Sequence, residues 1–227
     1  MNMRPIFSPG RLVIASLLLV LVNGCSTLRQ ATAPQPSFYF LDNARTAAVP
    51  IRQGAKQSPG KSPTLIVNPP HAAPGFDSPR IIYVREAHKL EYFSHSEWAD
   101  TPARMLAPLI VAALERSGTF GAVVLTPSAA AGELRLDTEI LRLQQDFGGS
   151  PSRVRFTLRA YVVDNTNRKV LAWRDFDASV AAPSEDAHGG VIAANSAVEE
   201  VLEHLVGFCA DVVETSYRAA TMAQDGQ

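Results

Sequence analysis

The amino-acid sequence predicts an α+β domain in which a mixed, mainly antiparallel sheet carries two helices packed on one face. Three strands in the second half alternate apolar and polar side chains, which is typical of a sheet with one buried face. Two other segments repeat apolar residues every three or four positions, the spacing of an amphipathic helix. Each helix must cover its apolar stripe, and the buried face of the sheet offers the surface for this.

Short strands are expected in the first half of the chain. The aromatic run over residues 37–41 and the β-branched run over residues 64–67 each predict one strand. After a turn-rich segment, residues 80–84 predict another, with residues 90–93 as its hairpin partner. Residues 42–63 contain glycines and prolines and few large apolar side chains, so we expect a loop there.

The first helix is expected over residues 101–117. The tripeptide at 100–102, Asp-Thr-Pro, places a capping side chain before a proline whose missing N–H does no harm at the first helical position. Gly118 supplies a stop signal. Pro108 lies inside this helix, where a proline costs about 3 kcal/mol unless the helix kinks.

A meander of three strands and a long helix are expected in the second half. The third strand covers residues 169–180, and the helix covers residues 190–218, where acidic residues oppose the apolar stripe. Cys209 lies in that stripe, which predicts an inert, buried thiol. The residues expected on the buried face of the first two strands are Leu134, Leu136, Thr138, Ile140, Val154, Phe156, Leu158, Ala160 and Val162.

Composition excludes several functional classes. The net charge of −1 provides no basic field for nucleic acid. No two of the five histidines stand four residues apart on a helix, so no metal site is predicted. The chain has neither a Gly-x-Ser-x-Gly nucleophile turn nor a phosphate-binding loop, and we predict no cofactor. An enzyme such as a lipid-anchored hydrolase is therefore not expected.

The N-terminal segment predicts a lipoprotein signal. Two arginines precede an apolar run over residues 12–22, which is followed by a small residue and Cys25. The run is about eleven residues long, well short of the roughly 20 that a membrane-spanning helix needs. We expect residues 1–24 to be removed and Cys25 to carry acyl chains that anchor the protein. An ordinary secretory signal is the alternative, because Asn23 is not the small or hydroxylated residue usual there.

The remaining chain divides into a tether and one domain. Residues 25–36 are rich in Pro, Ala, Thr and Gln, a composition that suits a lipidated tether. Residues 37–220 have the length of a single ordinary domain. Ser26, where Asp would favour retention in the inner membrane, predicts sorting to the periplasmic face of the outer membrane.

Aromatic and charged side chains concentrate between residues 76 and 102. Tyrosine and tryptophan suit both a core edge and a recognition surface, and the sequence leaves both interpretations open. We take Tyr92 and Trp98 as the candidate partner-binding residues, at or directly beneath the contact surface.

In order and spacing, these motifs resemble the ABC-type transport auxiliary lipoproteins, including the paraquat-inducible protein C type. The resemblance spans nearly the whole mature chain, with Phe40 and Pro108 as local departures. It is carried by the cysteine signal, the aromatic strand at 38–41, Asp-Ser-Pro-Arg-Ile-x-Tyr at 77–83, Leu-Glu-Tyr…Trp-Ala-Asp-x-Pro at 90–102, Ser-Gly-x-Phe at 117–120 and Gly-Gly-Val-x-Ala-Ala-Asn at 189–195.

The resemblance implies a non-catalytic outer-membrane lipoprotein of an intermembrane transport system. Such systems pair an inner-membrane ABC transporter, or a related membrane protein, with a periplasmic protein of mammalian-cell-entry (MCE) domains, and move phospholipid or other hydrophobic molecules. The lipoprotein would dock the far end of the MCE protein, with a homo-oligomeric ring as one arrangement. Residues 42–63 and 76–98 are the expected contact segments. The alternative function is a lipoprotein scaffold or activator of a peptidoglycan enzyme.

Overall fold

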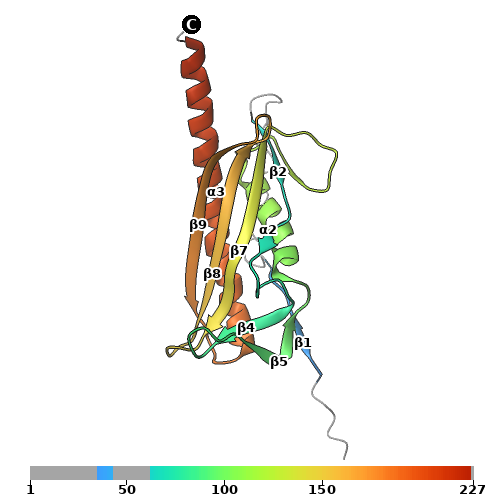
Figure 1. Cartoon of the computed structure of the whole chain (residues 1–227), viewed down its shortest axis with the longest axis vertical. Coiled ribbons are helices and arrows are strands. Elements are labelled where there is room, and N and C mark those ends of the chain that lie inside the picture. Colours follow the sequence, from blue (N-terminus) through green and yellow to red (C-terminus); the bar gives the residue numbers. More distant parts are fainter. Residues whose placement is uncertain (1–34, 43–61, 226–227) are drawn as a thin grey trace, which may run out of the picture. The chain divides into compact units, whose positions relative to one another are not determined.

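The structure is a computed structural model that describes residues 35–42 and 62–225. Within these residues two helices cover one face of an open, nine-stranded mixed sheet (Figure 1). The α+β class that the sequence predicts is confirmed. In chain order the elements are β1 (Ser37–Tyr39), β2 (Thr64–Val67), β3 (His71–Ala72), β4 (Arg80–Val84), β5 (Glu91–Trp98), α2 (Pro102–Ser117), β6 (Ala122–Leu125), β7 (Leu134–Asp146), β8 (Arg153–Asp164), β9 (Lys169–Ala181) and α3 (Ala187–Asp225).

The predicted meander is β7, β8 and β9, which pair antiparallel over almost their whole lengths. The predicted alternation of buried and exposed side chains is confirmed, because the nine residues assigned to the buried face of β7 and β8 are all buried. Phe156, Leu158 and Ala160 have no exposed surface at all. These side chains form the floor on which the helices pack.

β8 pairs with one edge of β7. Three short strands pair in parallel with the other edge, one after another along its length. β2 pairs with Leu134 to Leu136, β3 with Glu139 and Ile140, and β4 with Gln145 and Asp146. The sheet then continues outward on each side of β3, with β6 on β2 and β5 followed by β1 on β4. Strands β3 and β6 are not among the strands predicted from the sequence.

Helix α2 matches its predicted position but not its predicted cap. Leu106, Ile110 and Leu114 are fully buried against the core, and Gly118 ends the helix in the left-handed conformation with φ 68°. The N-cap residue Thr101 makes no side-chain capping bond, and its backbone N–H donates to the Asp100 carboxylate at 2.7 Å. Pro108 is tolerated on the exposed side of the helix, where solvent can reach the carbonyl that lacks its helical donor.

Helix α3 packs on β8, β9 and α2 and joins the same core. It begins at Ala187 rather than at residue 190, because Asp186 accepts a hydrogen bond from the Gly189 N–H at 2.7 Å. The predicted end at residue 218 is also early, since the helix continues to Asp225. Neither helix in the described residues is long and apolar enough to cross a bilayer.

Candidate functional site

The β4–β5 hairpin carries a packed aromatic cluster at its base. The Tyr83 ring lies 4.6 Å from the ring of Phe93 and 5.6 Å from that of Phe147, between centroids. Arg85 donates two hydrogen bonds to the Glu91 carboxylate, at 2.8 and 2.6 Å, and its guanidinium lies 5.4 Å from the Tyr83 centroid. These hydrogen bonds hold the pKa of Glu91 below its usual value. The cluster therefore fixes the hairpin in one conformation.

The hairpin tip rests on the preceding turn. Gly75 has a φ of +94°, and a Cβ at this position would lie 3.2 Å from the Leu90 Cδ1. His88 also adopts a positive φ, 67°, which gives the tip its tight reversal. We call Tyr83, Arg85, Leu90, Glu91, Tyr92 and Phe93 the hairpin surface.

The two candidate partner-binding residues have different environments. Tyr92 is 38% exposed, and the Arg80 guanidinium lies 4.9 Å from the centroid of its ring. Trp98 is only 4% exposed and belongs to the hydrophobic core. Tyr92 can therefore touch a partner directly, whereas Trp98 can only support the surface from beneath.

A second exposed apolar group lies on β1 and the first turns of α3, and sequence reasoning missed it. Phe38 and Phe40 project to solvent, while Tyr39 packs on the core and Leu41 is buried. Ile192, on α3, is also largely exposed. We call Phe38, Phe40 and Ile192 the β1 surface.

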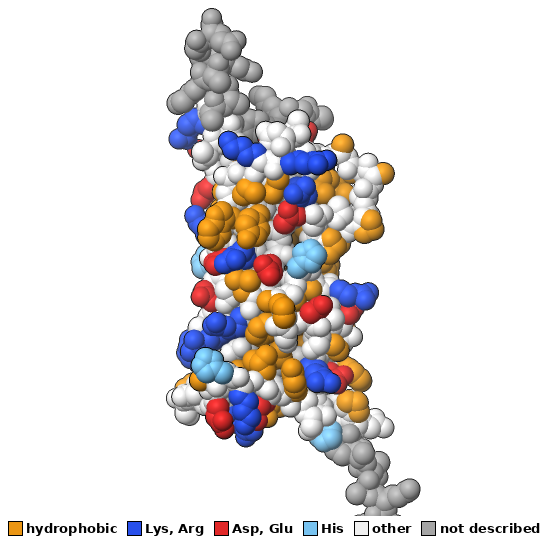
Figure 2. All heavy atoms as spheres, viewed as in Figure 1, with side chains coloured by type: hydrophobic (Ala, Val, Ile, Leu, Met, Phe, Trp, Pro, Cys, Tyr) orange, Lys and Arg blue, Asp and Glu red, His pale blue; other side chains and the backbone are white. Residues whose placement is uncertain are grey.

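The sheet face opposite the helices carries mainly polar and charged side chains, together with the aromatic pair Tyr161 and Trp173. Figure 2 shows acidic and basic side chains interspersed over this face, with apolar patches between them. Trp173 is 58% exposed, next to the Tyr161 ring, and Arg159 holds its guanidinium 5.5 Å from the Trp173 centroid. Arg159 also donates two hydrogen bonds to Asp175, at 2.7 and 2.9 Å, and thereby lowers the pKa of that carboxyl.

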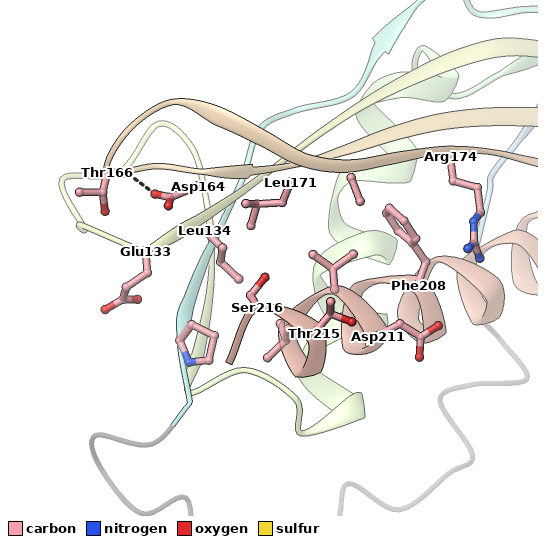
Figure 3. Close-up of a pocket in the computed structure, with 14 residues that line it drawn as sticks. Glu133, Leu134, Asp164, Thr166, Leu171, Arg174, Phe208, Asp211, Thr215 and Ser216 are labelled. Atoms are coloured by element: carbon pink, nitrogen blue, oxygen red, sulfur yellow. Dashed lines mark hydrogen bonds between the residues drawn. The ribbon is translucent and has the colours of Figure 1, made fainter. Parts of the chain in front are cut away.

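A groove of about 770 Å³ lies between the start of β9 and the second half of α3. Leu171 and Phe208 face it from opposite sides, and Val212 and Val213 add to its apolar floor (Figure 3). At one end of the groove, Asp164 already accepts a hydrogen bond from the Thr166 N–H at 2.8 Å. Apolar contact, more than charge, is therefore what this groove offers a ligand.

The described residues contain no group of three or more His, Cys, Asp or Glu side chains placed to hold a metal ion. Cys209 is buried as predicted, and burial raises the pKa of its thiol to about 12, so it is a poor nucleophile. Cys25 and most of the predicted contact loop 42–63 lie outside the described residues.

Comparison with known proteins identifies the family. The structure of protein XCC0632 from Xanthomonas campestris, assigned to family DUF330, has 26% identity and a TM-score of 0.64, covering 70% of this chain and 90% of that one. An uncharacterized protein shares the fold at 11% identity and a TM-score of 0.59, covering 77% of this chain and 99% of its own. No curated protein matches the sequence. The model of the ABC-type transport auxiliary lipoprotein component matches residues 46–206, most of the chain, and the protein belongs to this family.

Proposed function

We propose that this protein is an outer-membrane lipoprotein, anchored through Cys25 on the periplasmic side, which docks an MCE-domain partner and supports transport of hydrophobic molecules. An inner-membrane ABC transporter or related component would complete the system. Membership of a transport auxiliary family supports a role in an assembly rather than in catalysis. A homo-oligomeric ring would present several identical docking surfaces to one partner.

The hairpin surface is the docking site that we propose. The observation that carries this choice is the Tyr92 ring, exposed at its surface and stacked with Arg80. Aromatic and arginine side chains held in place before binding are the usual source of interface affinity, because little side-chain entropy remains to be lost. The hairpin meets this requirement through the Arg85–Glu91 pair and the Tyr83 cluster.

The docking test compares Tyr92→Ala with Trp173→Ala in a pull-down of the MCE protein from detergent-solubilised envelope. Each variant removes one exposed aromatic ring, so the general effect of truncation is matched. We expect Tyr92→Ala to lower affinity about thirtyfold, equivalent to roughly 2 kcal/mol, and Trp173→Ala to leave it unchanged. Both variants should unfold at the wild-type temperature. The reverse ranking would move the contact to the open sheet face.

Trp98→Ala tests whether Trp98 supports the docking surface from beneath and makes no contact with the partner itself. It removes a core side chain, and we expect a loss of about 3–5 kcal/mol in the free energy of unfolding, with weaker capture only as a consequence. Recovery of a peptidoglycan enzyme in place of the MCE protein would replace the proposed function by the scaffold alternative.

The anchor is tested by Cys25→Ser, which removes the thiol that would receive the diacylglyceryl group. We expect an uncleaved or released protein that no longer fractionates with the outer membrane. A variant still found there at the mature mass would contradict lipidation of Cys25.

A further inference from the structure

The two most exposed large apolar side chains in the described residues are Phe40, at 62%, and Phe38, at 59%. Phe38 lies on β1, at the edge of the sheet, and Phe40 follows directly after that strand. Isolated exposed apolar residues are common, but two phenylalanines two positions apart project to the same side of the chain and form an apolar strip. Nothing in the described residues covers it.

The backbone contacts of this segment hold both rings outward. The Tyr39 carbonyl accepts a hydrogen bond from the Ala99 N–H at 2.7 Å, and the Phe40 carbonyl accepts one from the Asn195 side chain at 3.2 Å. Turning the two phenylalanines inward would expose Tyr39 and Leu41, which pack on the core. The strip is therefore a fixed feature of the fold.

Helix α3 lies beside this segment and adds one exposed apolar side chain, Ile192. His188 lies beside Tyr39, with ring centroids 6.2 Å apart, and Asn195 bonds to the segment after β1. Positions 188, 192 and 195 share one helix face, which places Ile192 between these two contacts. Ile192 is 44% exposed, so the β1 surface comprises three apolar side chains from two elements.

The β1 surface is also the part of the domain that the chain reaches first after the proposed anchor. Ser37 is 12 residues after Cys25, so the intervening chain can span at most about 40 Å. The 13-residue strand β9 is about 43 Å long, so the opposite end of the sheet lies a strand length farther along the domain. An anchored domain would therefore keep the β1 surface closer to the bilayer, on average, than the opposite end of the sheet.

We propose that the β1 surface docks on the phospholipid bilayer, with Phe38, Phe40 and Ile192 at the boundary between headgroups and acyl chains. This inference rests on the proposed anchor at Cys25. Aromatic and aliphatic side chains enter this boundary readily, and the acyl anchor makes the encounter intramolecular. Asp42 and Glu97, the β5 partner of Phe38, outnumber the one basic neighbour, Arg80, which is the β4 partner of Glu97. This acidic excess favours zwitterionic over anionic lipid. Docking would give the tethered domain a fixed orientation on the membrane.

The test places an environment-sensitive NBD dye at Ser37→Cys in the full lipidated protein, reconstituted in phosphatidylcholine vesicles that contain acyl-chain nitroxide quencher. Cys209 is buried, so the new thiol is the reactive one. A second sample carries the dye at Val170→Cys, an exposed position on β9. We expect blue-shifted, quenched emission at position 37 and neither effect at position 170. Adding anionic lipid should reduce the quenching.

The matched variant is Phe38→Ser with Phe40→Ser, in the Ser37→Cys background. We expect it to lose the blue shift and the quenching while still floating with the vesicles, because the acyl chains remain and exposed positions were changed. Vesicle-bound protein whose dye at position 37 stays in water overturns docking but leaves the anchor intact. Protein that does not float at all overturns the anchor itself. A blue shift that appears without vesicles assigns the β1 surface to protein contact and also overturns the inference.

Discussion

Asn195 and Asp42 are hydrogen-bonded although 153 residues separate them in the chain. The Asn195 Oδ1 accepts a hydrogen bond from the Asp42 N–H at 2.8 Å, and its Nδ2 donates to the Phe40 carbonyl at 3.2 Å. One amide side chain therefore satisfies both a donor and an acceptor of the segment that leaves β1. This pair ties the first strand to the first turns of α3.

Asn195→Ala should release the segment after β1. The variant leaves one backbone N–H and one carbonyl without their partners, and we expect a loss of about 1–2 kcal/mol in the free energy of unfolding. Hydrogen exchange should accelerate at residues 39–42 more than in β8. Asn195→Asp keeps the acceptor for the Asp42 N–H and lacks the donor, so its exchange rates should lie between those of the wild type and Asn195→Ala. Uniform acceleration across the domain would contradict a local role.

Gly190 and Gln145 are predicted to couple energetically. Gln145 is 2% exposed and donates to the Ser152 hydroxyl at 2.9 Å, and a Cβ at Gly190 would overlap its side-chain oxygen. Gly190→Ala should therefore lower stability by about 1–3 kcal/mol. The double variant with Gln145→Ala should be more stable than the sum of the two single changes, by about 0.5–3 kcal/mol. Urea unfolding measures all three, and simple additivity would show that the two side chains do not compete for space.

Asp186 should make α3 sensitive to acid. Hydrogen bonds from the Gly189 N–H and then the Ser184 hydroxyl hold the pKa of its carboxyl below the usual value. The carboxylate therefore stabilises the fold above about pH 4, and this contribution is lost as the pH falls through the lowered pKa. Asp186→Ala should cost about 1 kcal/mol at neutral pH. Asp186→Asn keeps a capping oxygen but does not titrate, so its stability should fall less between pH 4 and pH 2 than that of the wild type.

Cys209 should make the domain sensitive to alkali. Burial raises the pKa of the folded thiol to about 12 from an ordinary value of 9.0, so the folded state holds the proton more tightly than the unfolded state. The free energy of unfolding should consequently decrease as the pH rises above about 9 and through the raised pKa. In Cys209→Ala this part of the slope should vanish. An identical slope in both proteins, measured by urea unfolding, would mean that other groups dominate the alkaline range.

Periodicity was sufficient to predict the elements that contribute most to the core. The alternation in β7 and β8 and the apolar stripe in α3 both arise because one face of each element is buried. The spacing of apolar residues in the sequence reveals such a buried face directly. Strand β3 has two residues and β6 has four, and neither is long enough to express a period. The sequence predicts the start of α3 at residue 190, within the Gly189–Gly190 pair and three residues late. Those glycines instead permit close approach to Ser184 and Gln145, which only the folded chain reveals.

The candidate surfaces were predictable only in part. The local clustering of aromatic and charged residues selects both Tyr92 and Trp98, but it does not distinguish the exposed Tyr92 ring from the buried Trp98 ring. Phe38 and Phe40 belong to an aromatic run in which every residue is apolar, so the sequence does not indicate which face of the segment meets the core. The groove beside Phe208 combines segments from four parts of the chain, so no local sequence pattern could predict it.

The succession of β2, β3 and β4 along one edge of β7 has a consequence for how related chains can vary. Each short strand keeps its own register on β7, through Leu134 to Leu136, Glu139 to Ile140 and Gln145 to Asp146. A residue inserted in the link before or after β3 therefore displaces no other pairing, and doubling such a link costs only about 0.6 kcal/mol. An insertion within β8 would instead shift register against two neighbours at once. Length differences between family members should therefore accumulate in the links around β3, while the lengths of β7, β8 and β9 stay constant.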